Sequence, residues 1–328
     1  MPAAGARTSL SQSRAALIAA AIIYAVLLWA LHATYLNDVW DYYGFIYEPL
    51  SLARAATGFV LVASIAAFMP LQWTRPSALV VNLLFGIVYV PTVVITLGLS
   101  AASLERYGLE LVALALGMGF ISFASRLGRS SASNRTVRIA PLLLFWGVGC
   151  VWLVIQYSST MRFVGLDQMY AQRELGASTS LASGYLQTYF ANVLSPALFA
   201  LGLLRKNRFL LLMGLAGCLL IYMINAQKTV LLLPPAMVAL HLAMRWRGAI
   251  WSSSFVILAA LSAFASTALG LHLVGLRSYL LQDFLIFRML AIPGLTFSQY
   301  SDVFQKWGYT WWSNVRGLDL LVEPPPNL

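Results

Sequence analysis

One polar stretch of the sequence, STMRFVGLDQMYAQRELGASTS, gathers side chains that could bind a phosphate or a sugar. Its ionisable and aromatic members lie within 13 positions and are Arg162, Asp167, Tyr170, Arg173 and Glu174. If the segment is helical, Tyr170 and Arg173 share a face at i and i+3. The planar N–H donors of an arginine can bind two oxygens of one phosphate at the same time. Arg173 is therefore the leading candidate to bind a phosphate group. The alternative is an arginine paired with Glu174 or Asp167 that reaches the membrane interface.

Four further basic residues lie in or beside polar segments: Arg54, Lys228, Arg277 and Arg288. Arg54 lies about one turn into an apolar run, and such a charge needs a buried partner or an anionic ligand. Lys228 ends the turn Asn225-Ala226-Gln227-Lys228 and could anchor that turn at the membrane surface or contact an anionic head group. Arg288 precedes Ile292-Pro293-Gly294, which predicts a turn.

Aromatic side chains gather near two of these segments. The later group contains Tyr300, Phe304, Trp307, Tyr309, Trp311 and Trp312, and the earlier one lies in NDVWDYYGFIYEP at residues 37–49. Such rings stack on the apolar faces of sugars, and they also anchor helices at membrane interfaces. The earlier segment also contains acidic residues, so two interpretations stay open. It could be an aromatic belt at the membrane interface, or an acidic loop that contacts a sugar or a metal.

The elements that must position these residues are membrane spans. Of 328 residues, 60% are hydrophobic and 10% charged, and the mean hydropathy is +0.78, which excludes an ordinary soluble protein. We predict an all-α polytopic integral membrane protein with about nine transmembrane helices. They are residues 15–36, 49–69, 78–100, 108–125, 139–158, 181–203, 209–225, 229–244 and 248–271. Pro234-Pro235 should kink or break the eighth.

Charge predicts the orientation of these spans. With a cytoplasmic N-terminus, 12 of the 21 basic residues face the cytoplasm and all 11 acidic residues lie outside. The net charge of +10 therefore reflects topology, and nucleic acid is not needed as a partner. We expect residues 1–271 to form the helix bundle with an outer loop at 159–180, residues 272–328 to form a large periplasmic loop region, and the chain to stop short of further spans.

Three outer segments together resemble the Wzy-type oligosaccharide repeat-unit polymerases of bacterial O-antigen, capsule and exopolysaccharide synthesis. They are Tyr170-x-x-Arg173 leading to a span with Pro196, the turn Asn225-Ala226-Gln227-Lys228, and Phe287-Arg288-Met289-Leu290-Ala291-Ile292-Pro293-Gly294 followed by Tyr300 and Phe304. Arg173 and Gly184 also fit an Arg-x10-Gly pattern of that family. A second such pattern is missing, since the residue eleven after Arg288 is Gln299.

The resemblance implies a GT-C-like glycosyltransferase of the bacterial inner membrane, acting on its periplasmic face without cofactor or metal. The implied partners are an undecaprenyl-pyrophosphate-linked glycan, membrane lipids and, as an optional partner, a chain-length regulator. Arg173 and Arg288 would stabilise charge on the pyrophosphate and Glu174 would act as general base. The implied substrate-binding residues are Tyr170, Lys228, Arg54, Arg277, Tyr300 and Gly184.

Two other functions stay open at this point. An O-antigen ligase, or another glycosyltransferase using a lipid-linked sugar, shares the donor chemistry and differs in the acceptor. A flippase or transporter for repeat units would more often show internal repeats and paired broken helices. Asp167, Asp283 and His272 are alternatives to Glu174 as the base.

Overall fold

The computed structural model describes residues 4–73, 75–127, 139–165, 168–177, 181–245 and 253–308. These residues are helical, apart from turns, short connections and one isolated β-bridge between Gln72 and Ser253. The all-α prediction is therefore confirmed for the described part of the chain. The chain divides into two units: unit 1 is Met1–Arg129 with Arg247–Leu328, and unit 2 is Ser130–Trp246.

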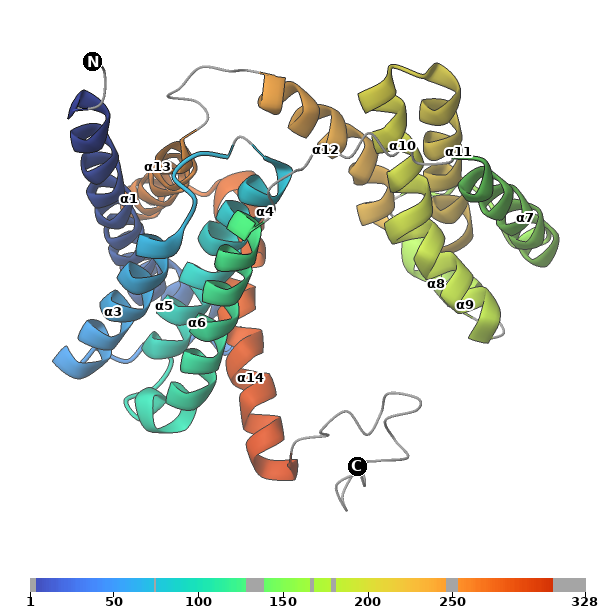
Figure 1. Cartoon of the computed structure of the whole chain (residues 1–328). Coiled ribbons are helices and arrows are strands. Elements are labelled where there is room, and N and C mark those ends of the chain that lie inside the picture. The colour runs from blue at the N-terminus through green and yellow to red at the C-terminus, as the bar shows by residue number, and fades with distance from the viewer. Residues whose placement is uncertain are drawn as a thin grey trace. The chain divides into compact units, whose positions relative to one another are not determined.

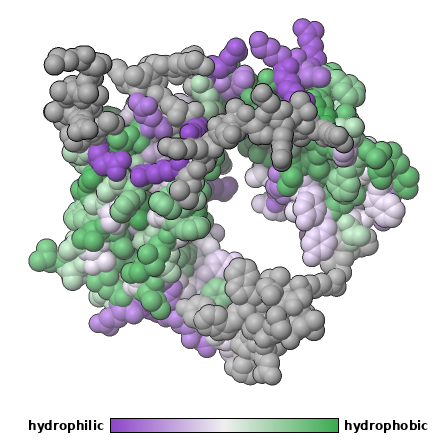
Figure 2. All heavy atoms as spheres, viewed as in Figure 1, coloured by the Kyte–Doolittle hydropathy of each residue, from purple (hydrophilic) through white to green (hydrophobic). Residues whose placement is uncertain are grey.

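Unit 1 packs its helices around one hydrophobic core (Figure 1). Its elements are α1 Ala4–Leu31, η1 His32–Leu36, α2 Asn37–Trp40, η2 Asp41–Tyr43, α3 Leu52–Phe68, α4 Pro76–Leu84, η3 Phe85–Tyr89, α5 Val90–Gly98, α6 Ser103–Leu127, α13 Ser254–Leu273, η5 Tyr279–Ala291 and α14 Ile292–Trp307. The segments η1, η3 and η5 are π-helical. Over unit 1, Figure 2 shows an apolar band between two polar ends, as expected where helices cross a bilayer.

Acidic residues gather at one end of unit 1, some of them paired with arginines, and Arg14 and Arg126 lie at the other. At one end, His272 Nε2 lies 3.5 Å from Asp38 and the Tyr35 hydroxyl donates to Asp283 at 2.8 Å. We call this the acidic end. At the other, the basic end, Arg14 donates to the carbonyl of Ala67 and Arg126 to those of Phe68 and Met69. This confirms the predicted segregation of charge within unit 1, while the side of the membrane that each end faces stays a prediction.

Unit 2 is a smaller helical bundle. Its elements are α7 Ile139–Tyr157, α8 Met169–Ala177, α9 Leu181–Tyr189, η4 Phe190–Leu194, α10 Ser195–Arg205, α11 Arg208–Asn225 and α12 Lys228–Arg245. A tight turn joins α10 to α11: Lys206 is left-handed at φ 54°, and the Asn207 side chain caps α11 by accepting from Phe209 N and Leu210 N. Gly214 lets the two backbones meet, since a Cβ there would lie 2.4 Å from Phe199 N.

Eight described helices are long and apolar enough to cross a membrane, so the chain is a multi-pass membrane protein. They are Arg14–Tyr43, Pro76–Gly98, Ser103–Arg126, Ile139–Tyr157, Ala182–Arg205, Arg208–Asn225, Ser254–Leu273 and Tyr279–Trp307. Seven correspond to predicted spans. The predicted spans 49–69 and 229–244 correspond to the shorter apolar helices Leu52–Phe68 and Lys228–Leu242.

The eighth long helix, Tyr279–Trp307, falls in the segment expected as a periplasmic loop region. Its contacts with the rest of unit 1 include Asp283 with Tyr35 and Asp302 with Tyr107, both at the acidic end. The turn expected at Ile292-Pro293-Gly294 is absent, because Ile292 is helical and Pro293 lies in the first turn of α14, where its missing N–H is tolerated. Pro234 and Pro235 likewise lie inside α12 and do not end it.

Candidate functional site

An open pocket of about 590 Å³ lies in unit 2 at the junction of α8, α9, α11 and α12. Its lining residues are Arg173, Gly176, Gln187, Asn192, Asn225, Gln227 and Thr229. We call it the amide pocket, because four of these side chains are carboxamides. Pockets of roughly 300 to 1,000 Å³ are typical of sites for small ligands.

The short helix α8 is anchored by one buried glutamine. Gln172 donates from Nε2 to the carbonyls of Thr160 at 3.0 Å, Met223 at 2.9 Å and Ile224 at 3.1 Å. Its Oε1 accepts from Arg162 Nε at 3.1 Å. The carbonyls of Met223 and Ile224 belong to the last turn of α11, where intrahelical donors run out. Gln172 thereby fixes the next residue, Arg173, beside the end of α11.

Gly176 lets α8 approach α11 closely. A Cβ at this position would lie 2.6 Å from the carbonyl oxygen of Ile224 and 3.2 Å from Cα of Asn225. Both are backbone atoms and cannot rotate away as a side chain could. The glycine is therefore required by packing, and it forms part of the pocket wall.

Two buried carboxamides form the base of the pocket. Asn225 Nδ2 donates to Gln187 Oε1 at 3.3 Å, and Gln187 Nε2 donates to the Tyr157 hydroxyl and the Gly176 carbonyl. Asn225 Oδ1 also accepts from Gln227 N at 3.2 Å, across the left-handed residue Ala226 at φ 49°. These bonds fix the amide orientations before any ligand arrives.

The charge at the pocket comes from Arg173. Its side chain is exposed, its guanidinium lies 5.6 Å from the centre of the Tyr170 ring, and it forms no ion pair with a described residue. None of the described lining residues is acidic. Gln227 and Thr229 flank the first residue of α12, so the positive end of that helix dipole lies at the wall. A cation, a helix N-terminus and carboxamides together suit an anionic, hydroxyl-rich ligand.

The structure places the predicted residues of unit 2 around this pocket with different roles. Arg173 lines it, and the contact with Tyr170 confirms the predicted shared face. Glu174 is exposed on α8, and Lys228 is exposed between two lining residues. Gly184 lies on α9 with open space around it, so packing does not require glycine there. Asp167 lies outside the described residues.

Arg54, in unit 1, is a structural residue. It is 3% exposed, and its guanidinium donates to the carbonyls of Leu97 at 3.1 Å, Ser100 at 2.8 Å and Pro49. The buried partner that the sequence required is therefore the backbone at the end of α5. Its Nε is buried with no hydrogen-bond partner among the described residues, and contact of Arg54 with a substrate stays a prediction.

The other predicted residues of unit 1 lie along η5 and α14. Arg277 forms an ion pair with Asp283 at 3.2 Å, and that bond and charge raise the pKa of Arg277. The Tyr35 hydroxyl binds the same carboxylate oxygen, so Asp283 is engaged rather than poised as a base. Arg288 and Tyr300 are exposed. These residues belong to unit 1, whereas the described lining of the amide pocket belongs to unit 2.

Sequence reasoning missed Gln172, Gln187 and Asn192 as site residues. For Gln187 and Asn192 the available signal was a carboxamide inside an apolar run, where each unpaired polar group is costly. Asn192 also lies in the π-helical segment η4, and such segments are frequent at functional sites.

No family model, curated protein or solved structure matches this chain.

Proposed function

We propose that the chain is a membrane glycosyltransferase that polymerises undecaprenyl-pyrophosphate-linked oligosaccharide repeat units. The amide pocket would bind the pyrophosphate and the adjoining sugar of the donor. The observation that carries the proposal is Arg173, an exposed cation in a carboxamide-lined pocket of a multi-pass membrane protein. The resemblance of Tyr170-x-x-Arg173 and Asn225-Ala226-Gln227-Lys228 to Wzy-type polymerases supports it, since both segments border this pocket.

The chemistry needs a fixed cation. When the anomeric bond of the donor breaks, negative charge develops on the pyrophosphate, and a group that binds this charge more strongly in the transition state lowers the barrier. Arg173 offers planar paired donors, and the N-terminus of α12 adds partial positive charge. Lys228, the first residue of that helix, lies between the lining residues Gln227 and Thr229.

The carboxamides suit the sugar part of the donor. Gln187 and Asn225 are held by hydrogen bonds to each other and to the backbone, so they present donors and acceptors without reorganising. The described part of the lining contains no acid, so the base for the acceptor hydroxyl would come from the rim of the pocket, where Glu174 follows Arg173. Arg288 is our second candidate for contact with a pyrophosphate. The architecture we propose is GT-C-like, with the amide pocket on the periplasmic face of the bacterial inner membrane.

The test is the glycan ladder of a strain lacking the gene and complemented with variants. Arg173→Ala should abolish long-chain glycan and leave a band with one repeat unit. Arg205→Ala, which removes an exposed arginine at the end of α10 away from the pocket lining, is the matched control and should restore the full ladder. Loss of every repeat would indicate a ligase, loss of every repeat with trapped lipid-linked units a flippase, and normal long-chain glycan from Arg173→Ala would refute the role of this residue.

A further inference from the structure

Two arginines from different helices meet at the basic end of unit 1. Arg14 of α1 donates to the carbonyl of Ala67. Arg126 of α6 donates to the carbonyls of Phe68 and Met69. Ala67 and Phe68 are the last two residues of α3, where carbonyls lack intrahelical donors, so the same helix end holds both guanidiniums. We call Arg14 and Arg126 the arginine pair.

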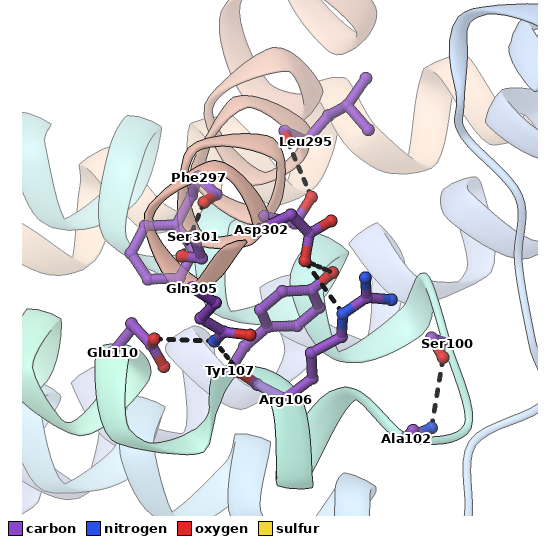
Figure 3. A network of polar contacts seen from close by, with 11 residues as sticks. Ser100, Ala102, Arg106, Tyr107, Glu110, Leu295, Phe297, Ser301, Asp302 and Gln305 are labelled. Atoms are coloured by element: carbon purple, nitrogen blue, oxygen red, sulfur yellow. Dashed lines mark hydrogen bonds and ion pairs between the residues drawn. The ribbon is translucent and has the colours of Figure 1, made fainter. Parts of the chain in front are cut away.

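No carboxylate among the described residues neutralises the arginine pair. Neither arginine forms an ion pair there, and their charges are close enough to repel each other. The sequence around them, residues 1–37 and 111–138, contains no Asp or Glu. The acidic end differs, because there Arg106 Nε binds the Asp302 carboxylate at 3.0 Å (Figure 3). The arginine pair therefore favours an anion that the described protein groups do not supply.

Both members of the arginine pair keep donors for such an anion. The contacts with α3 use Nη1 of Arg14 and Nη2 of Arg126. The other two nitrogens of each guanidinium have no hydrogen-bond partner among the described residues, and both side chains reach the surface. The planar donors of an arginine match the oxygens of a phosphate, so one phosphate could bridge the pair.

The arginine pair lies at the level of lipid head groups. Arg14 begins the apolar span Arg14–Tyr43, and Arg126 ends the span Ser103–Arg126. Phe123 precedes Arg126 by three residues and shares its face of α6. Phe68 and Phe123 are both 58% exposed, so apolar rings border the charges on the side of the bilayer. Paired cations next to exposed apolar rings match a phospholipid, whose phosphate adjoins its acyl chains.

We propose that the arginine pair is a binding site for an anionic phospholipid of the phosphatidylglycerol type. The lipid phosphate bridges Arg14 and Arg126, and an acyl chain lies on Phe68 and Phe123. In phosphatidylethanolamine an ammonium group offsets the phosphate, and the described residues of this site include no carboxylate to bind that ammonium. The site is separate from the amide pocket and does not depend on the function proposed for it.

Native mass spectrometry of the full chain in detergent tests the proposal. Dioleoyl phosphatidylglycerol and dioleoyl phosphatidylethanolamine are titrated separately, and the first bound lipid is quantified. The unmodified protein should prefer phosphatidylglycerol. Arg14→Gln with Arg126→Gln should lower that preference about tenfold or more, because each arginine near an anionic head group contributes about fivefold in affinity. Glutamine still donates to the carbonyls of α3, so this variant should fold.

Arg205→Gln with Arg208→Gln is the matched control. It removes the same charge from two exposed residues where α10 meets α11 in unit 2, so the preference should stay unchanged. Arg14→Lys with Arg126→Lys keeps both charges and should keep most of the preference. Elution as a single species verifies that each variant is folded. Excess inorganic phosphate should not displace the lipid, since it has no acyl chain to contact the two phenylalanines.

Four results would each overturn the proposal. They are an unmodified protein that does not prefer phosphatidylglycerol, equal effects of the two glutamine double variants, loss of the preference in the lysine double variant, and displacement of the lipid by inorganic phosphate.

Discussion

Replacing Gly176 with alanine should separate α8 from the end of α11. The added Cβ would lie 2.6 Å from the Ile224 carbonyl oxygen, whereas ordinary contacts begin at 3.4 Å, so the helix must move by 3.4 − 2.6 = 0.8 Å. The two bonds from Gln172 Nε2 to α11, now 2.9 Å to the Met223 carbonyl and 3.1 Å to the Ile224 carbonyl, would then exceed the limit of about 3.5 Å.

The cost follows from those bonds. Each is worth about 1 kcal/mol net, so their loss lowers the free energy of unfolding by about 2 kcal/mol, which lies within the usual cost of overpacking. At about 2 to 4 °C per kcal/mol, the apparent Tm should fall by about 4 °C or more.

The change in Tm is measured by thermal unfolding of the purified protein in detergent, with circular dichroism as the signal. The control is Gly184→Ala on α9, where a Cβ meets nothing within 4 Å and alanine improves helix propensity by about 0.5 to 1 kcal/mol. Its Tm should stay equal or rise slightly. Equal Tm values for the two variants would refute the packing that we describe for the amide pocket.

Two further predictions concern arginines of unit 1. Arg54→Met should lower the free energy of unfolding by about 3 kcal/mol, because three backbone carbonyls lose their donor. The control Arg173→Met changes an exposed residue and should leave the Tm unchanged. Equal Tm changes for the two variants in thermal scans would contradict this prediction. Arg277→Gln should cost less than about 1 kcal/mol, since the Arg277 side chain is 62% exposed and glutamine can still donate a hydrogen bond to Asp283. Asp283 raises the pKa of Arg277. The contribution of Arg277 to stability is therefore fully present below the ordinary pKa of arginine, and it is lost only as the pH rises through the raised pKa. The Tm difference should therefore be the same at about pH 6 and about pH 9, and a smaller difference at the higher pH would contradict the assignment.

The helices of this protein could be predicted because bilayer thickness sets the length of an apolar run. Charge also segregated as predicted in unit 1, where Arg14 and Arg126 lie at the end opposite Asp38 and Asp283. These features depend on local composition, which a single sequence contains. Tyr279–Trp307 was harder to predict, because Asp283, Arg288 and Pro293 interrupt its apolar pattern.

The side-chain partners could not be predicted, because they depend on contacts between distant segments. Arg54 looked like a ligand for an anion, but carbonyls more than 40 residues away bind it. Gln172 carried no sequence signal of its own, and its importance appears only when α8 lies against the end of α11. Arg173 and the turn at Asn225 were predicted as separate candidates, and the structure shows that both line one pocket.

The most direct measurement is polymerisation by the purified protein in liposomes with a synthetic undecaprenyl-pyrophosphate-linked repeat unit and no nucleotide sugar. Gel analysis of the extracted lipids should show products of two or more repeats with the unmodified chain. With the Arg173→Ala variant, once its Tm is shown to equal that of the unmodified chain, the repeat unit should stay unextended. A failure of the unmodified chain to extend the repeat unit, or equal extension by the variant, would contradict the proposed function.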